Sequence, residues 1–362
     1  MRASGLQYRA GSVGIALFAV GLCGCHRAPA AAPAPAGGPP VARVVDAAAG
    51  GEPAPTGAAP QAGREGVDAR PAAPDGAGGL EAVVDAGADA IPPASASACP
   101  AGRSLVWRLD FRDPAWNGGA SGVQAAIRAA GGTLDRVSGT EHVSVVDDPV
   151  HGKALLVRYP PGSGSDDCVN LKMCTSAGGV VFFLPLPDGG AIKSVFLSYW
   201  LAFQPGFEWT RGGKLPGLCG HGCPIAGAKV EPDRFSLRYM WRMNGLGEVY
   251  SYLTSPPNSV YGLEMGTGRW TFTNDGSWHH LQEELVLNDG NSANGVVRVW
   301  YDKAPSGPPD FEQKNLQYYD RTRYPDLGID TLVFTTFHGG HDRRWSPTTE
   351  VKTMFADFQL CR

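Results

Sequence analysis

The sequence predicts an all-β domain, a β-jelly-roll sandwich of two antiparallel sheets, preceded by a disordered tether. Segments in which apolar and polar residues alternate recur along the rear of the chain, with glycine, proline, asparagine and aspartate between them. All nine tryptophans lie between Trp107 and Trp345, whereas residues 26–98 contain no Phe, Trp or Tyr. Strands at this density, without helices between them, are typical of a sandwich or jelly roll.

The predicted strands alternate with turn residues from residue 104 to the end of the chain. The strands that begin at 194, 279 and 331 are the long ones, and we expect them to span the two sheets. One segment, 122–130, has the apolar spacing of a helix. In chain order the predicted strands are 104–111, 142–146, 154–159, 180–186, 194–203, 235–242, 248–253, 279–287, 296–301, 331–337 and 353–360.

The first 24 residues have the pattern of an export signal. Arg2 and Arg9 precede a short apolar run over 13–22, which is too short to cross a bilayer as a mature helix. The run ends in Leu-Cys-Gly-Cys, which resembles the bacterial lipobox, with Cys25 at the position of the lipidated cysteine. His26 follows it rather than aspartate, which favours an outer-membrane lipoprotein. The alternative is a simple cleaved signal followed by incidental cysteines.

Residues 25–98 form the predicted linker. They are mainly alanine, proline and glycine, with four arginines and eight acidic residues. A segment without aromatic residues cannot bury enough apolar surface to offset the entropy of ordering, so we expect it to be disordered. The remaining domain, 99–362, has 25 basic and 27 acidic side chains. This balance argues against a nucleic-acid partner, which would require a basic surface.

Six cysteines follow Cys25, an even number that suggests disulfides in an exported domain. Two of them bracket the domain and the other four form two close neighbour pairs. The predicted bonds are therefore Cys99–Cys361, Cys168–Cys174 and Cys219–Cys223. Because His221 lies between Cys219 and Cys223, a metal site is the competing interpretation, and we disfavour it because thiolate sites belong mainly to reducing compartments.

The candidate chemistry is in three segments, 209–218, 235–252 and 337–347. Alternation in 235–242 directs Phe235, Leu237, Tyr239 and Trp241 to the core, and Ser236 and Arg238 to the open face. Tyr250 and Tyr252 share a face of the next strand. Arginine, two tyrosines and a nearby lysine are not the paired carboxylates of a glycosidase. They suit an acidic sugar, whose carboxylate a guanidinium can hold with two hydrogen bonds.

These segments resemble polysaccharide lyase family 14, which has a β-jelly-roll fold and includes alginate and glucuronan lyases. The likeness is carried by Gly-Gly-Lys-Leu-Pro-Gly-Leu at 212–218, Ser-Leu-Arg-Tyr-Met-Trp-Arg at 236–242 and Tyr-Ser-Tyr at 250–252. It continues in 278–288, 299–302 and 337–340. It covers most of 190–362 and is weaker before that. One departure is the loop after the lysine motif, which contains Cys219, His221 and Cys223.

The resemblance implies β-elimination on an acidic polyuronate, without a cofactor or metal. Carried over by position, the catalytic residues are Lys214, Arg238, Tyr250 and Tyr252, and Ser236 belongs to the same set. Lys214 and Arg238 are assigned to the negative charge and a tyrosine to proton transfer, with Lys214 as base left open. Further substrate-binding candidates are Trp209, Arg242 and His338.

One face must carry both Arg238 and the two tyrosines if they serve one substrate. This requirement predicts a hairpin in which Arg238 lies opposite Tyr252 and Met240 opposite Tyr250, with 244–246 as the loop. A slip of one residue would turn the tyrosines away from Arg238.

Three alternatives accompany this interpretation. The first is a carbohydrate-binding jelly roll on a surface lipoprotein, which would bind the polymer without cleaving it. The second is a purely structural envelope lipoprotein. The third is a metal site at His338, His341 and Asp342, which we disfavour because histidines in turns are common without ligation. The partners we expect are an acidic polysaccharide and a membrane, through the lipid at Cys25, and we expect a monomer.

Overall fold

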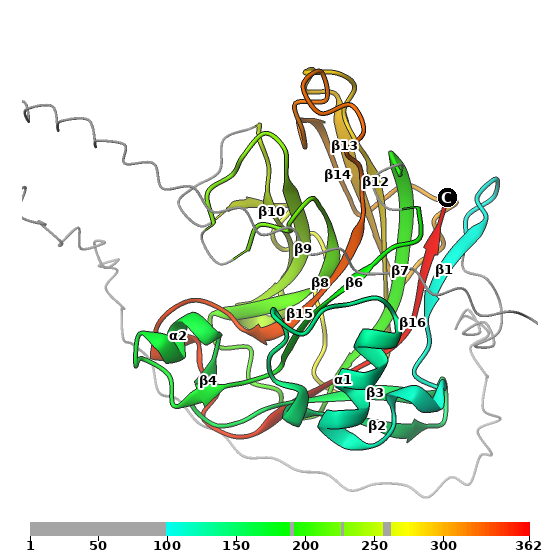
Figure 1. The fold of residues 1–362 in the computed structure, drawn as a ribbon. Helices are drawn as coiled ribbons and strands as arrows, with labels where there is room; N and C mark the ends of the chain where they lie inside the picture. Colours follow the sequence, from blue (N-terminus) through cyan, green and yellow to red (C-terminus); the bar gives the residue numbers. More distant parts are fainter. Residues whose placement is uncertain (1–98, 189–191, 226–227, 256–261) are drawn as a thin grey trace, which may run out of the picture. The chain divides into compact units, whose positions relative to one another are not determined.

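Two antiparallel β-sheets form the folded domain (Figure 1). The computed structural model describes residues 99–362 apart from 189–191, 226–227 and 256–261. The signal, the lipidation site at Cys25 and the linker predicted from the sequence lie outside the described residues. Within the described residues, no helix is long and apolar enough to span a bilayer.

The larger sheet has eight strands. Their order is β14 (Phe311–Leu316), β13 (Gly295–Tyr301), β12 (His279–Val286), β7 (Ser194–Phe203), β16 (Val351–Cys361), β3 (Gly152–Tyr159) and β2 (Val143–Asp148), and β1 (Leu105–Leu109) also pairs with β16.

The smaller sheet has six strands, in the order β11 (Leu263–Met265), β10 (Gly247–Tyr252), β9 (Phe235–Arg242), β8 (Gly212–Gly220), β15 (Thr331–His338) and β6 (Val180–Pro185). The two sheets confirm the predicted all-β sandwich.

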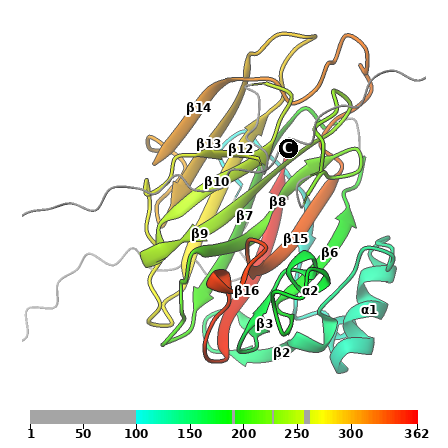
Figure 2. The ribbon, with the colours of Figure 1, turned by 90° about the vertical axis from the view of Figure 1, so that its left-hand side faces the viewer.

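Short elements complete the domain. Helix α1 (Gly119–Ala129) begins three residues before the predicted one, and α2 (Asp166–Asn170) was not predicted. Both helices lie toward the same end of the sheets (Figure 2). Strands β4 (Ser163–Gly164) and β5 (Ser176–Ala177) pair in parallel, and single 3₁₀ turns occur at Pro114–Trp116, Thr140–His142, Met243–Gly245 and Arg343–Trp345.

The core lies between the two sheets and is built from the alternate residues that the sequence directs inward. In β9, Leu237, Tyr239 and Trp241 are buried, and they pack toward Leu197, Tyr199 and Leu201 of β7 within one apolar cluster. Complete burial of such side chains stabilises the fold by about 1.5–3 kcal/mol each. The inward residues of β9 therefore fix which of its residues face the opposite side.

Strand β8 is the main element that the sequence did not predict. No strand is predicted over 212–220, because glycine and proline, which are frequent there, are depleted in strands. The structure shows why glycine is needed: a Cβ on Gly213 would lie 2.1 Å from the Trp241 ring. Pro216 sits where the pairing of β8 with β9 shifts register, between Leu215 and Gly217, which is where a central strand tolerates proline.

The hairpin of β9 and β10 corrects the predicted register by two residues. Tyr250 lies opposite Arg238, Tyr252 opposite Ser236 and Glu248 opposite Met240. The turn is centred on Asn244 rather than Gly245, because a 3₁₀ turn over Met243–Gly245, with positive φ at Asn244 and Gly245, connects Arg242 to Leu246. A shift of two preserves the face of every side chain, so Arg238 and both tyrosines still share a face.

All three predicted disulfides are present. Cα–Cα distances are 5.6 Å for Cys99–Cys361, 5.2 Å for Cys168–Cys174 and 5.1 Å for Cys219–Cys223, within the usual range. The first bond ties the start of the domain to its last strand. The third begins inside β8 rather than in a loop, since Cys219 belongs to that strand.

Candidate active site

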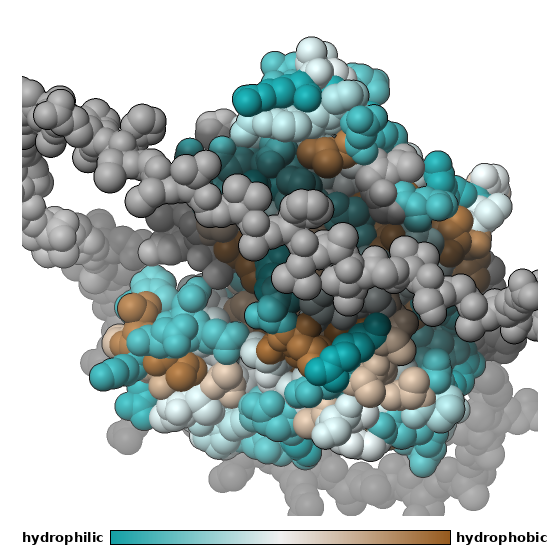
Figure 3. All heavy atoms as spheres, viewed as in Figure 1, coloured by the Kyte–Doolittle hydropathy of each residue, from teal (hydrophilic) through white to brown (hydrophobic). Residues whose placement is uncertain are grey.

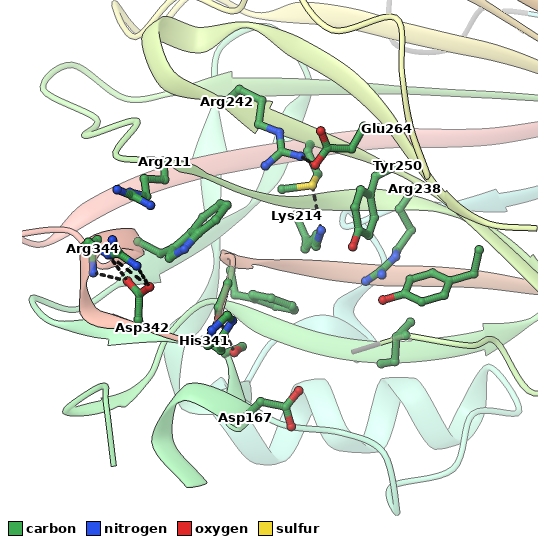
Figure 4. A pocket seen from close by; sticks show the side chains of 17 residues that line it. Asp167, Arg211, Lys214, Arg238, Arg242, Tyr250, Glu264, His341, Asp342 and Arg344 are labelled. Atoms are coloured by element: carbon green, nitrogen blue, oxygen red, sulfur yellow. Dashed lines mark hydrogen bonds and ion pairs between the residues drawn. The ribbon is translucent and has the colours of Figure 1, made fainter. Parts of the chain in front are cut away.

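A cavity of about 340 Å³ lies on the face of the six-stranded sheet that points away from the core (Figure 4). Strands β8 to β10 supply its floor, through side chains that alternate with the buried core residues. The loop after β15 and the start of α2 supply its walls. Its floor residues are Lys214, Arg238, Met240, Arg242, Tyr250 and Tyr252.

Lys214 lies at the centre of this floor. Its side chain is 9% exposed, and Nζ lies 3.2 Å from the centre of the Tyr250 ring and donates to Sδ of Met240 at 2.7 Å. Burial, reinforced by the positive charges of Arg238 and Arg242, lowers the pKa of Lys214 well below its ordinary value. This direction favours the uncharged amine, which is the form that can accept a proton.

Arg238 is the cation that keeps its charge, although burial lowers its pKa, because a guanidinium does not deprotonate in proteins. It is 1% exposed, and one terminal nitrogen donates to Oγ1 of Thr335 at 3.3 Å. Among the described residues, Nε has no hydrogen-bond partner and no carboxylate pairs with the group. Figure 4 shows the guanidinium beside Tyr250, directed into the cavity. An anion that enters the cavity would supply the missing counter-charge.

The two tyrosines stand next to each other on β10. Their rings meet edge to face, with centres 5.8 Å apart. Burial and the neighbouring Tyr252 raise the pKa of the Tyr250 hydroxyl far above its ordinary value. Tyr250 therefore keeps its proton at neutral pH and is suited to donate it rather than to act as a base.

Arg242 lines the cavity, as predicted, but it is already paired. Its Nε donates to Glu248 at 3.0 Å and a terminal nitrogen donates to the same carboxylate at 2.8 Å. A second carboxylate, that of Glu264 on β11, pairs with the same guanidinium at the mouth of the cavity. Glu248 is fully buried and Glu264 is 57% exposed, so only the outer pair can be displaced at low cost.

The cavity thus holds, within one small space, an amine with a lowered pKa, a protonated phenol and a guanidinium that pairs with no carboxylate among the described residues. Among the described residues, no three His, Cys, Asp or Glu side chains come close enough together to hold a metal ion. A sequence profile described as polysaccharide lyase 14 matches residues 148–358, more than half of the chain. The chain belongs to polysaccharide lyase family 14.

Solved structures with the same fold include alginate lyases. The alginate lyase of Aplysia kurodai is 23% identical, with a TM-score of 0.57 over 71% of this chain and 98% of that one. Alginate lyase Aly36B is 18% identical, with a TM-score of 0.54 over 71% and 97%. Alginate lyase vAL-1 from Chlorella virus is 20% identical, with a TM-score of 0.53 over 71% and 99%. No curated protein sequence matches the chain.

Three residues predicted to bind substrate do not line the cavity of this family 14 lyase. Ser236 shares the face of Arg238, but it is fully buried, and its Oγ donates to the carbonyl of Pro224 at 2.5 Å. Trp209 is partly buried and packs against the core, with its ring centre 4.7 Å from that of Phe203. Burial closes Ser236 to substrate, whereas Trp209 is partly buried and lies outside the lining of this cavity.

His338 also lies in the core rather than in the cavity. It is 1% exposed, its Nε2 lies 2.8 Å from the carbonyl oxygen of Glu208, and its ring stacks on Phe207. Burial lowers its pKa to about 4, so the ring is neutral. The geometry makes His338 a packing residue in this lyase and does not support its assignment to substrate binding.

The cavity also contains residues that the site prediction omitted. Met240 contacts the Lys214 amine, and the alternation of β9 already placed it on the face of Arg238. Trp345, Arg211, His341 and Arg344 come from loops, where periodicity carries no information. Figure 4 shows Arg211, His341 and Arg344 at one end of the cavity, with Asp167 of α2 on the facing wall.

Proposed function

We propose that this protein cleaves an acidic polyuronate by β-elimination at the cavity of Lys214. The observation that carries the proposal is the arrangement of three groups in one cavity: an amine whose pKa is lowered by burial and two arginines, an arginine that pairs with no described carboxylate, and a phenol that keeps its proton. Each matches one requirement of the reaction. A uronate loses its C5 proton readily only if its carboxylate is neutralised and a base and an acid are at hand.

In the reaction that we infer, Arg238 binds the uronate carboxylate and stabilises the enolate formed at C5. Lys214 takes the C5 proton, the electron pair forms the C4–C5 double bond, and the C4–oxygen bond breaks. The leaving oxygen receives a proton from Tyr250. The products are a new reducing end and an unsaturated uronate, and proton return from Lys214 to Tyr250, directly or through water, completes the cycle. The assignment of Lys214 as base rests on the direction of its pKa and on the opposite direction for Tyr250.

Alginate is the polyuronate that we propose as the first substrate to test. The support is that the solved structures with this fold named above are alginate lyases. Fold likeness at this sequence identity does not choose between uronates, so the panel of test substrates also includes glucuronan and other polyuronates.

The test is incubation of the full-length chain with this panel while the ultraviolet absorbance of unsaturated uronate ends is followed. We expect release from at least one polymer, and a loss of at least about a hundredfold in Lys214→Ala, with an unchanged circular dichroism spectrum. Binding of a polymer without any release would support a carbohydrate-binding module instead. Equal rates in wild type and Lys214→Ala would refute the proposed base.

We also propose that the chain is an outer-membrane lipoprotein anchored through Cys25 and active as a monomer. The support is the signal-like pattern of residues 1–25 and the three disulfides, which form in oxidising compartments. Mass spectrometry of the mature N-terminus and fractionation of a Cys25→Ala variant test the anchor. Size-exclusion chromatography of that variant tests the monomer. An unlipidated wild-type protein in the soluble fraction would contradict the anchor.

A further inference from the structure

A second cavity adjoins the catalytic one and is unused by the chemistry above. Its volume is about 580 Å³, and it is lined by Leu171, Met173, His341, Asp342, Arg343 and Arg344. Three of these residues, His341, Asp342 and Arg344, line the catalytic cavity as well. The two spaces are therefore neighbours, separated only by residues that line both.

One wall of the second cavity is an apolar turn held in shape by a disulfide. Leu171 and Met173 follow α2 and are 60% and 48% exposed, which is unusual for such large apolar side chains. The bond between Cys168 and Cys174 closes the turn. In Figure 3 hydrophobic surface gathers where Figure 1 shows α2. The apolar groups are thus presented to solvent by a constrained segment.

The opposite wall is basic. Arg344 is fixed by Asp342, whose carboxylate accepts two hydrogen bonds from Nε and one from a terminal nitrogen. Arg343 and Arg211 are both exposed, and neither forms an ion pair with another residue that the structure describes. The lining of the second cavity therefore carries two positive charges against the single negative charge of Asp342.

Two contacts join the apolar turn to the arginine loop on the opposite wall. Oγ of Ser165, which caps α2, donates to the carbonyl of Gly340 at 3.0 Å. The Sγ of Cys174 lies 3.4 Å from Oγ of Ser346. These contacts hold the apolar turn and the arginine loop at a fixed separation, so the space between them is built into the fold.

We propose that the second cavity binds further sugar units of the same polyanion, beyond those held in the catalytic cavity. This inference rests on the proposed function. A uronate unit has a carboxylate at its edge and C–H groups on its ring face, and these match the guanidinium wall and the Leu171 and Met173 wall. The enzyme then prefers long chains, and the preference resides in Arg343 and Leu171, which line the second cavity and not the catalytic one.

The experiment measures binding apart from cleavage. In a Lys214→Ala background, titration calorimetry compares a trisaccharide and an octasaccharide of the polyuronate on which wild type is most active, alginate in the first instance. Arg343→Gln with Leu171→Ser should weaken octasaccharide binding at least about fivefold and trisaccharide binding less than about twofold. Both residues are exposed, so the fold is not at risk. Arg128→Gln, an exposed arginine of α1 outside both cavities, is the matched control and should change neither affinity.

Kinetics on the active enzyme give a second readout. The double variant should raise KM for polymer while kcat stays within about twofold, because it removes binding shared by ground state and transition state. Equal effects on both oligomers, or no effect on either, would overturn the inference while leaving the lyase activity standing. Absence of cleavage together with the expected octasaccharide loss would overturn the proposed function and support the inference. Failure of both oligomers to bind would overturn the second cavity as a binding site.

Discussion

Two clusters of buried charge, one in each sheet, differ in how their charges are matched. In the eight-stranded sheet, Asp357 lies at a register shift of β16 and receives Arg108 at 2.9 Å, Arg112 at 3.3 Å and His151 at 2.7 Å. In the six-stranded sheet, Lys214 and Arg238 share a cavity where the nearby carboxylates of Glu248 and Glu264 pair with Arg242 instead.

The difference indicates two roles for buried charge. The paired charges around Asp357 stabilise the fold, whereas the charge of Arg238 can bind an anionic ligand. Buried ions are stable when they are paired, and an unpaired one costs several kcal/mol. The lowered pKa of Lys214 favours loss of its proton, which reduces this cost, whereas Arg238 keeps its charge. Arg238 therefore lowers stability in the free protein, and the uronate carboxylate restores the pairing that the sheet leaves open.

Removal of Arg238 should have the largest effect and tests the roles that we assign to the two clusters. Arg238→Met keeps most of the volume and removes the charge. We expect a loss of at least about a hundredfold in kcat, because the enolate loses its fixed cation. We expect no loss of thermal stability, because replacing an unpaired buried charge by an apolar side chain is neutral or stabilising. Absorbance assays and thermal unfolding test both. A variant that unfolds more easily than wild type would show that Arg238 holds the fold.

The converse test removes the carboxylate charge of Asp357 from the paired cluster. Asp357→Asn leaves Arg108, Arg112 and His151 without their shared carboxylate. We expect a loss of about 2–3 kcal/mol in the free energy of unfolding, measured by urea denaturation, with kcat within about twofold below the melting temperature. The partner arginines are partly exposed, which keeps the loss at the lower end. A variant of normal stability and low activity would reverse the roles that we assign to the two clusters.

Glu283 of β12 is a carboxyl group whose pKa burial also shifts toward the neutral form. It is buried between the sheets, its Oε2 lies 2.9 Å from the Tyr239 hydroxyl, and Tyr199 and Tyr318 also face it. No cation pairs with it among the described residues, and burial raises its pKa to about 8. As for Lys214, burial shifts the pKa toward the neutral form, and Glu283 is protonated at neutral pH.

This predicts a pH-dependent stability. The unfolded chain releases the Glu283 proton near the ordinary pKa, while the folded protein retains it up to about 8. Between these values the folded state binds more protons, so the contribution of Glu283 to stability falls as pH rises and is constant above the folded pKa. Glu283→Gln removes this dependence. Its melting temperature relative to wild type should rise from about pH 5 to about pH 8. A difference that is constant or shrinks over this window would contradict the burial of a neutral carboxyl.

The sequence predicted the sandwich and the floor of the cavity better than its walls. Alternation in β9 predicts that Arg238 faces away from the core. The structure has this arrangement, because Leu237 and Trp241 are buried in the core and Arg238 therefore lies on the opposite face of the strand. Lys214 was found through the family motif, although its strand was not, since the glycines of β8 have no strand preference until Trp241 packs on them.

The remaining errors depend on tertiary structure. The hairpin register was shifted by two residues because the turn at Asn244 and Gly245 is not encoded by alternation. Trp209 and His338 have residue types that bind sugars, and only the tertiary structure shows that Trp209 packs on Phe203 and that His338 is buried against Phe207. The loop residues that wall the cavity come from segments far apart in the chain.

The smallest predicted effect concerns Glu264, the exposed carboxylate at the mouth of the cavity. Its negative charge raises the pKa of Lys214, against the larger influences of burial and the two arginines that lower it. Glu264→Gln should therefore lower the pKa of Lys214 further. Because the base is active when deprotonated, the ascending limb of kcat/KM against pH should move to lower pH. The shift should be small, since Glu264 is 57% exposed and water screens it.

The same variant should also lower KM for a polyanion, because Arg242 keeps Glu248 as partner while the mouth of the cavity loses a repelling charge. Glu312→Gln is the matched control: it removes an equivalent partly exposed carboxylate, paired with Arg298 in the other sheet. It should leave both the pH profile and KM unchanged. If the ascending limb moves equally in both variants, it reports net charge rather than Lys214. If it moves to higher pH in Glu264→Gln, the base is not a lysine whose charge Glu264 stabilises.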